Sequence, residues 1–358
     1  MARDWSIREY SARDKQGVFE LRKAAYGESF DEQAWEWKFE NGPVGPAQIL
    51  VAEKDALIIG IRPTIFMPMK IMNKVLTAGL NVDVMTHPDF RHRGIFSTLV
   101  QEALKRLNEQ GVNLVFTFPN ENSYPGYVRR LRWYHVCSLP LLAKPLNIDN
   151  IVKKYFKTSL LRKPAKLMAR AVISTLLSSE PSRPNGLQIS TVESFDDRFN
   201  ELWQRASSQY QIAVVRDKKY LNWRYIDRPG QEYTVFSAQR GTNLVGYVIV
   251  KSNVRMFDLV LGLIVDILAS DDNHVADYLI AQAIEYFRGE KVDAIGCVML
   301  KHTPYHKALK RNGFIQVPQL LSPKEFYFMV HFNSGEIPKV LAGNPVNWFL
   351  TFGDFDIA

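Results

Sequence analysis

The stretch HPDFRHRGIFSTLV, residues 87–100, places two arginines and a histidine directly before a glycine and then continues with residues that favour a helix. The residues before it, LNVDVMT, alternate as a strand does, and Pro88 ends that strand because proline cannot donate to a β-ladder. The residues after it are amphipathic and stop at Gly111. The apolar face of this helix consists of Leu99, Ala103, Leu104 and Leu107. The stretch therefore predicts a strand, a basic turn over residues 91–96 and a helix.

The start of such a helix is suited to hold a phosphate. The first backbone N–H groups of a helix lack partners, and the helix dipole is positive there. A phosphate at that point accepts several N–H hydrogen bonds, and nearby arginines add favourable charge. Gly94 leaves room for a phosphate to approach the backbone. Since a solvated turn can have the same residues, the interpretation depends on the rest of the chain.

The chain contains an internal repeat. The heptapeptide WKFENGP, residues 37–43, recurs as WRYIDRP at residues 223–229, and further matches follow in the same order, including Gly60 with Gly246. Each half reads as a strand and a helix, a β-meander, a helix, a strand and a last helix. This order predicts an α/β fold with two tandem units, each a mixed, mostly antiparallel sheet with helices on both faces. Trp37 and Trp223 are either core anchors or a stacking surface for a ligand.

The expected organisation has four parts. Residues 1–146 form the first unit, 147–186 a basic helical linker, 187–332 the second unit and 333–358 a tail that docks on the body. Residues 151–179 of the linker contain seven Lys or Arg and no acid. They are either a solvated basic helix pair or a weak attachment to an anionic membrane surface.

Composition narrows the class of protein. The chain has 358 residues, 46% of them apolar, and a net charge of +8, which favours an anionic partner. Nucleic acid is not expected because no zinc-finger spacing or RNA-recognition signature is present. Cys137 and Cys297 lie far apart among apolar residues, so they are expected to be reduced thiols. No apolar run of about 18 residues that could span a membrane occurs. A reducing cytoplasm is therefore the expected compartment.

The segment His87–Phe96 resembles the acyl-CoA pyrophosphate motif of the GNAT (Gcn5-related) N-acetyltransferase superfamily, Arg/Gln-x-x-Gly-x-Gly/Ala. Arg91 and Gly94 match the motif, whereas Phe96 replaces its small residue. Asn122 and residues 127–133 resemble the later Asn…Tyr…Gly-Phe element of the family, with Arg132 in the place of the glycine. The duplicated architecture resembles tandem GNAT proteins.

This resemblance implies a set of residues that bind acetyl-CoA. The backbone of residues 84–86 would hold the pantetheine arm, and the loop and helix start would hold the pyrophosphate. Asn122 would form a hydrogen bond to the cofactor amide, or else its segment, PNENS, is only a loop. The expected cofactor-binding residues are Val84, Met85, Thr86, Arg91, His92, Arg93, Gly94, Ile95, Phe96, Ser97 and Asn122.

Catalysis of acetyl transfer needs a base for the amine and an acid for the departing thiolate. Asp83 is the candidate base, directly or through water, or else a surface carboxylate. Tyr127, with Tyr124 in reserve, is the candidate acid, or else a packing residue. No metal site is expected.

The second half departs from the motif at the corresponding point, LASDDNHVADYL. Asp271, Asp272 and Asp277 put negative charge where a phosphate would lie, so this copy is expected to support the fold and form one wall of an acceptor pocket. The function expected from these features is N-acetyl transfer from acetyl-CoA to a small amine, such as an amino sugar. The alternatives are an aminoacyl transferase of the FemAB type that uses charged tRNA, and a CoA-binding scaffold without turnover.

Overall fold

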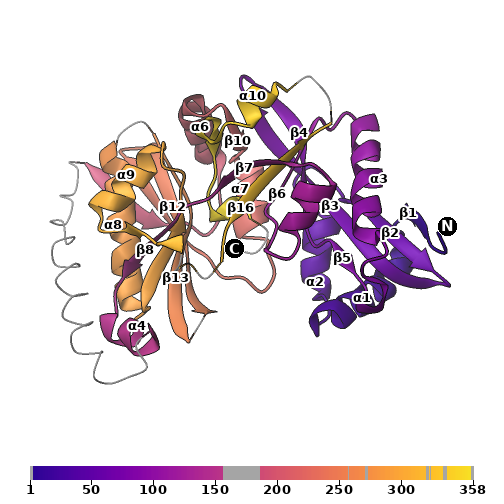
Figure 1. The fold of residues 1–358 in the computed structure, drawn as a ribbon. Coiled ribbons are helices and arrows are strands. Elements are labelled where there is room, and N and C mark those ends of the chain that lie inside the picture. The colour runs from indigo at the N-terminus through magenta and orange to yellow at the C-terminus, as the bar shows by residue number, and fades with distance from the viewer. Residues whose placement is uncertain are drawn as a thin grey trace.

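The computed structural model describes residues 3–155, 186–256, 258–270, 273–319, 322, 324–333 and 337–355. Most of the predicted linker, including the basic stretch after α4 (Ile148–Tyr155), lies outside these residues, as do Asp271 and Asp272. The described part of the chain forms two separate mixed sheets that lie beside each other, with helices packed around them (Figure 1). The predicted fold class, two tandem α/β units, is confirmed.

The two sheets have the same strand order over the described residues. The first runs β1 (Ser6–Glu9), β2 (Gln48–Lys54), β3 (Leu57–Ile71), β4 (Lys74–Asn81), β6 (Leu114–Thr117), β16 (Tyr327–Phe332), β7 (Tyr134–Ser138). The second runs β9 (Leu187–Thr191), β11 (Thr234–Arg240), β12 (Asn243–Met256), β13 (Leu259–Ala269), β14 (Ala294–Val298), β8 (Leu141–Pro145), β15 (Ile315–Gln316). In both orders the fourth and fifth strands pair in parallel. The internal repeat of the sequence therefore corresponds to a repeated sheet.

The two halves contribute strands to each other's sheets. Strand β8, from the first half, pairs with β14, and β16, from the second half, pairs with β6. Figure 1 shows yellow β16 among the strands of the first sheet and β8 beside the orange strands of the second. The units predicted at 1–146 and 187–332 thus exchange their last strands, which ties the two halves together through backbone hydrogen bonds.

The first sheet is extended by β5 (Met85–Thr86) and β10 (Ile212–Val214), which pair with β3, and by β17 (Trp348–Phe349), which pairs with β10. Helices cover both faces of this sheet. The helices α1 (Lys15–Tyr26) and α2 (Glu32–Trp35) pack on one face, and α3 (Ile95–Glu109) packs on the other. The apolar face predicted for α3 is buried in the structure.

Helices of the second half are α6 (Asp197–Ala206), α7 (Lys218–Tyr225), α8 (Asn273–Gly289) and α9 (Pro304–Arg311), and α10 (Lys339–Ala342) follows near the end. The repeated glycines explain how α3 and α8 pack. A Cβ on Gly60 would lie 2.7 Å from Cγ2 of Ile95, and one on Gly246 would lie 2.9 Å from Cδ1 of Leu279. Both helices therefore lie directly on the backbone of their sheet.

The repeated tryptophans meet where the two halves join. The rings of Trp37 and Trp223 stack with centroids 4.8 Å apart. Each indole Nε1 donates to the backbone carbonyl of the other residue, at 2.6 and 3.2 Å. Because equivalent residues make the same contact in both directions, a local two-fold axis passes between them. The tryptophans are core anchors.

Arg132, which stands in the place of the family glycine, has φ 53, and its repeat equivalent Gly313 has φ 79. Only glycine adopts this left-handed region without steric cost, and Arg132 is exposed, so its side chain adds little packing. We expect Arg132→Gly to raise the free energy of unfolding by about 0.5–1 kcal/mol. Urea unfolding of the two proteins measures this, and an unchanged or lower midpoint contradicts it.

Candidate active site

A cavity of about 840 Å³ lies where two neighbouring strands of the first sheet diverge. Strands β4 and β6 pair only at Gly79–Val115 and Leu80–Phe116. Beyond this point the predicted strand over residues 80–86 is interrupted: β4 ends at Asn81 and β5 begins at Met85. Asp83 has φ 44 here, and its carboxylate turns toward Lys38. The break opens the sheet, and the cavity passes through the opening.

The expected cofactor-binding residues meet at this cavity with the exception of Arg93, whose guanidinium lies 5.0 Å from the ring centroid of Phe90. Those that line it are Val84, Met85, Thr86, Arg91, His92, Gly94, Ile95, Phe96, Ser97 and Asn122. The structure thus brings together the interrupted strand, the basic turn and the start of α3. Their roles in binding stay predictions.

The start of α3 is open to the cavity. Gly94 is the N-cap residue with φ 80, and a Cβ placed on it would meet no atom within 4 Å. The helical series begins with the Thr98 N–H donating to the Gly94 carbonyl at 3.0 Å. The amides of residues 95–97 precede that series, and these residues line the cavity. An anion at this site would therefore find both backbone N–H donors and open space.

Phe96 replaces the small residue of the motif without closing the loop. Its ring packs edge-on against Tyr127, with centroids 5.2 Å apart, and it lies over Gly126, where a Cβ would come within 3.0 Å of its Cε1. The larger side chain at position 96 is thus accommodated by a glycine at 126.

Tyr127 lines the cavity and is buried. The Asn81 side-chain amide donates to the Tyr127 hydroxyl oxygen at 2.5 Å. Burial raises the pKa of Tyr127 to about 12. The hydroxyl is therefore protonated at neutral pH, and because its oxygen accepts from Asn81, its own hydrogen is available to donate.

The other two catalytic candidates are placed differently. Tyr124 is not among the residues that line the cavity: its hydroxyl contacts His135 Nδ1 at 2.8 Å, and its ring stacks on Tyr327. Asp83 lines the cavity, but its carboxylate pairs with Lys38 at 2.6 Å and lies 3.8 Å from Arg22. Asp83 is thus held in an ion pair at the cavity wall.

A buried polar row beneath the cavity was not predicted. Asn81 and Thr117 are 3% exposed, and the fully buried Arg62 donates through Nη1 to Thr64. Arg62 Nε and Nη2 and Asn81 Oδ1 have no hydrogen-bond partner among the described residues. Burial lowers the pKa of Arg62 to about 10. In the sequence, these residues could have been found as polar residues on the inward faces of strands that are otherwise apolar.

The second half supplies one wall of the cavity, through Lys324, Glu325, Phe326, Tyr327 and Phe355. The corresponding opening in its own sheet is filled. Tyr305 OH accepts from the Ala269 amide at 2.9 Å and lies 3.3 Å from its carbonyl. Ala269 is the repeat equivalent of Thr86, so the backbone groups that face the cavity in the first half are occupied here. Asp277 pairs with Arg311 at 2.7 Å.

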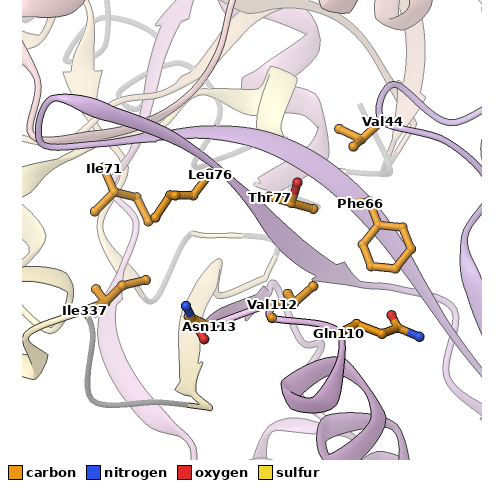
Figure 2. A pocket seen from close by; sticks show the side chains of 10 residues that line it. Val44, Phe66, Ile71, Leu76, Thr77, Gln110, Val112, Asn113 and Ile337 are labelled. Carbon is orange, nitrogen blue, oxygen red and sulfur yellow. The ribbon is translucent and has the colours of Figure 1, made fainter.

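A second cavity of about 320 Å³ lies at the far end of β3 and β4, beyond the C-terminus of α3, and contains none of the predicted site residues (Figure 2). Its lining residues are Val44, Phe66, Ile71, Leu76, Thr77, Gln110, Gly111, Val112, Asn113 and Ile337.

The comparisons with known proteins agree with this geometry. Residues 6–136 match the family model of the acetyltransferase (GNAT) domain. They form a GNAT domain. No curated protein matches the sequence. The loop that holds Arg91 and Gly94 and the helix turn with Tyr127 both lie inside the matched residues.

Solved structures extend the likeness to nearly the whole chain. The fold is similar to a GCN5-related N-acetyltransferase from Anabaena variabilis, with TM-score 0.64 and 13% identity over 95% of this chain and 75% of that one. It is also similar to N-myristoyltransferase of Saccharomyces cerevisiae with bound myristoyl-CoA, with TM-score 0.58 and 13% identity over 93% and 83% of the two chains. A probable N-acyltransferase from Enterococcus faecalis gives TM-score 0.62 and 13% identity over 94% and 74%.

The two sheets therefore have the fold of tandem GNAT-like units. Among the helices that the structure describes, none has the length and apolar character needed to cross a bilayer.

Proposed function

We propose that this protein is an N-acetyltransferase that moves an acetyl group from acetyl-CoA to the amine of a small acceptor. The observation that carries the proposal is a single cavity, at the break in the first sheet, that is lined both by the open start of α3 and by Tyr127. The match of residues 6–136 to a GNAT domain supports acyl-CoA chemistry at this cavity.

The residues of the chain fit the parts of acetyl-CoA. The amides of residues 95–97 and the charge of Arg91 would hold the pyrophosphate. The backbone of residues 84–86, next to the opening between β4 and β6, would hold the pantetheine arm. Acetyl-CoA supplies an activated thioester, and the direct attack of an amine on it needs correct positioning of both groups.

Tyr127 would donate its proton to the departing thiolate, since its hydroxyl is protonated and its oxygen is held by Asn81. The ammonium form of the acceptor must first lose a proton. Asp83 at the cavity wall is the candidate for that step, through water, although Lys38 holds its carboxylate. The wall contributed by the second half favours a small acceptor, because the cavity is bounded on both sides by protein.

Gly94→Asp tests the cofactor site. The new carboxylate would stand at the helix start and repel the pyrophosphate, and we expect acetyl-CoA affinity to fall by at least about tenfold in calorimetric titration. Gly111→Asp is the matched control, because Gly111 has φ 77, also meets no atom within 4 Å and lies beyond the other end of α3. The control should bind acetyl-CoA like the wild type.

Turnover is measured by thiol release with a panel of amines. Tight binding of acetyl-CoA with turnover on one of the amines supports the proposal. Binding without turnover on any amine would favour the scaffold alternative, and the absence of CoA binding would favour the tRNA-dependent alternative.

A further inference from the structure

The cavity continues past Tyr127 to the opposite face of the first sheet. Leu80 and Asn81 are adjacent in β4, so their side chains point to opposite faces. Asn81 faces Tyr127, on the side of α3, whereas Leu80 belongs to the core on the other side. Both residues line the cavity. If the thioester lies at Tyr127, as the proposed function requires, the acyl group extends toward Leu80.

An aromatic wall closes this end of the cavity. The rings of Phe118 and Phe355 stack with centroids 4.0 Å apart and an interplanar angle of 18°. Both line the cavity, together with Leu80. Phe355 is 3% and Leu80 4% exposed, so both side chains of the wall are buried. There is therefore little free space beyond a short acyl group.

A small cavity lies directly behind this wall. It has a volume of about 10 Å³, and its lining combines the apolar side chains of Ile65, Met67, Trp37 and Trp223 with Lys38, Tyr220, Arg224 and Asp354 at its edges. Leu80 and Phe355 line both cavities. These two side chains thus separate the main cavity from this space in the core between the two halves.

The backbone around Phe355 is held firmly. Arg224 donates from Nη2 to the Phe355 carbonyl at 2.7 Å and from Nε to the Gly353 carbonyl at 3.0 Å. The neighbouring Asp354 carboxylate pairs with the buried Arg216 at 2.9 Å. The ring of Phe355 is therefore a fixed stop, placed by a segment that lies more than two hundred residues after the GNAT domain.

We propose that Phe355, with Leu80, sets the acyl-chain length that the enzyme accepts, and that removing the Phe355 ring joins the two cavities into a longer apolar channel. The inference rests on the proposed function, because it needs the thioester at Tyr127. The wild-type protein then takes acetyl and similarly short acyl groups. A protein with a small residue at position 355 gains apolar walls for additional methylenes, each of which is worth about fourfold in affinity when buried.

The test is calorimetric titration of free CoA, acetyl-CoA, butyryl-CoA and hexanoyl-CoA without an acceptor amine. We expect the wild type to bind acetyl-CoA at least about tenfold more tightly than hexanoyl-CoA, since the longer chain meets the wall. For Phe355→Ala this preference should shrink by at least about tenfold, as extra methylenes enter the opened space. Phe355→Leu, which keeps more of the packing, should give a smaller shift in the same direction.

Phe352→Ala is the matched control. Phe352 is 6% exposed, packs on Phe326 and Phe355 in the same turn, and is not among the residues that line either cavity. It should keep the wild-type chain-length preference. If CoA binds but the preference is absent in the wild type or unchanged in both position-355 variants, the chain-length inference is wrong and the proposed function stands. If free CoA and acetyl-CoA do not bind at all, the proposed function fails, and this inference fails with it.

Discussion

Replacing Arg216 by methionine should lower the free energy of unfolding by about 3–5 kcal/mol, the usual cost of removing one partner from a buried ion pair. The guanidinium is fully buried between two carboxylates, with Nε 3.0 Å from Asp266 and Nη2 2.9 Å from Asp354. Burial alone would lower the pKa of Arg216, but the two carboxylates together raise it. Without the arginine, both acids remain in the core and lose the cation that pairs with them. Urea or thermal unfolding measures the loss.

Arg198→Met provides the comparison. Arg198 also pairs with an aspartate, Asp196, at 2.7 Å, but both side chains are nearly half exposed. Such surface pairs contribute about 0–1 kcal/mol, so this variant should unfold close to the wild type. Equal destabilisation by the two substitutions would contradict the importance of the buried network. Because Asp354 precedes Phe355, the Arg216 variant should also weaken the chain-length preference.

The features that sequence reasoning predicted are those encoded by neighbouring residues. The strand before Pro88, the basic turn and the helix with Leu99 and Leu107 on one face follow from local periodicity and from single glycines. The repeat was visible because equivalent contacts need equivalent residues: Gly60 and Gly246 allow a helix to lie on a strand, and Trp37 and Trp223 make one symmetric contact.

The exchange of strands could not be predicted in the same way. Either β8 or β16 could take the sixth position, beside the fifth strand, in either sheet. A strand pairs through its backbone, and the two sheets have the same strand order. Nothing in the residues 141–145 or 327–332 specifies which copy they join. The choice depends on the path of the chain between the halves, which is a property of the tertiary structure.

Parts of the site were missed for a related reason. Asn81, Thr117 and Arg62 come from three strands and become one buried row only after the sheet forms. Phe355 lies far from the GNAT domain in sequence, and tertiary contacts such as the pairing of β17 with β10 and the bonds from Arg224 carry the tail to the cavity. Asp83 was visible as a candidate, but its pairing with Lys38 depends on the break between β4 and β5.

Tyr127→Phe should reduce kcat by about 10²–10⁴-fold, because a positioned general acid contributes a factor of that size. The affinity for acetyl-CoA should stay within about threefold, because the substitution removes only a hydroxyl. Asn81 loses its acceptor, so the free energy of unfolding should fall by about 1 kcal/mol. Because the pKa of Tyr127 is raised to about 12, its neutral, donating form persists at alkaline pH. Ionisation of this group should therefore cause no loss of wild-type kcat between pH 7 and about pH 10.

Tyr124→Phe separates catalysis from packing. Its hydroxyl contacts His135 and it is absent from the cavity lining, so the variant should keep kcat within about threefold of the wild type if Tyr127 is the acid. Steady-state kinetics with the best amine of the panel, together with single-turnover thiol release, measures both variants. If the Tyr127 variant retained the wild-type kcat, or if the Tyr124 variant lost more of its kcat than the Tyr127 variant, the proton would come from another donor. Two features distinguish Tyr127 from Tyr124 for this step: Tyr127 lines the cavity, and its hydroxyl accepts from Asn81 at 2.5 Å.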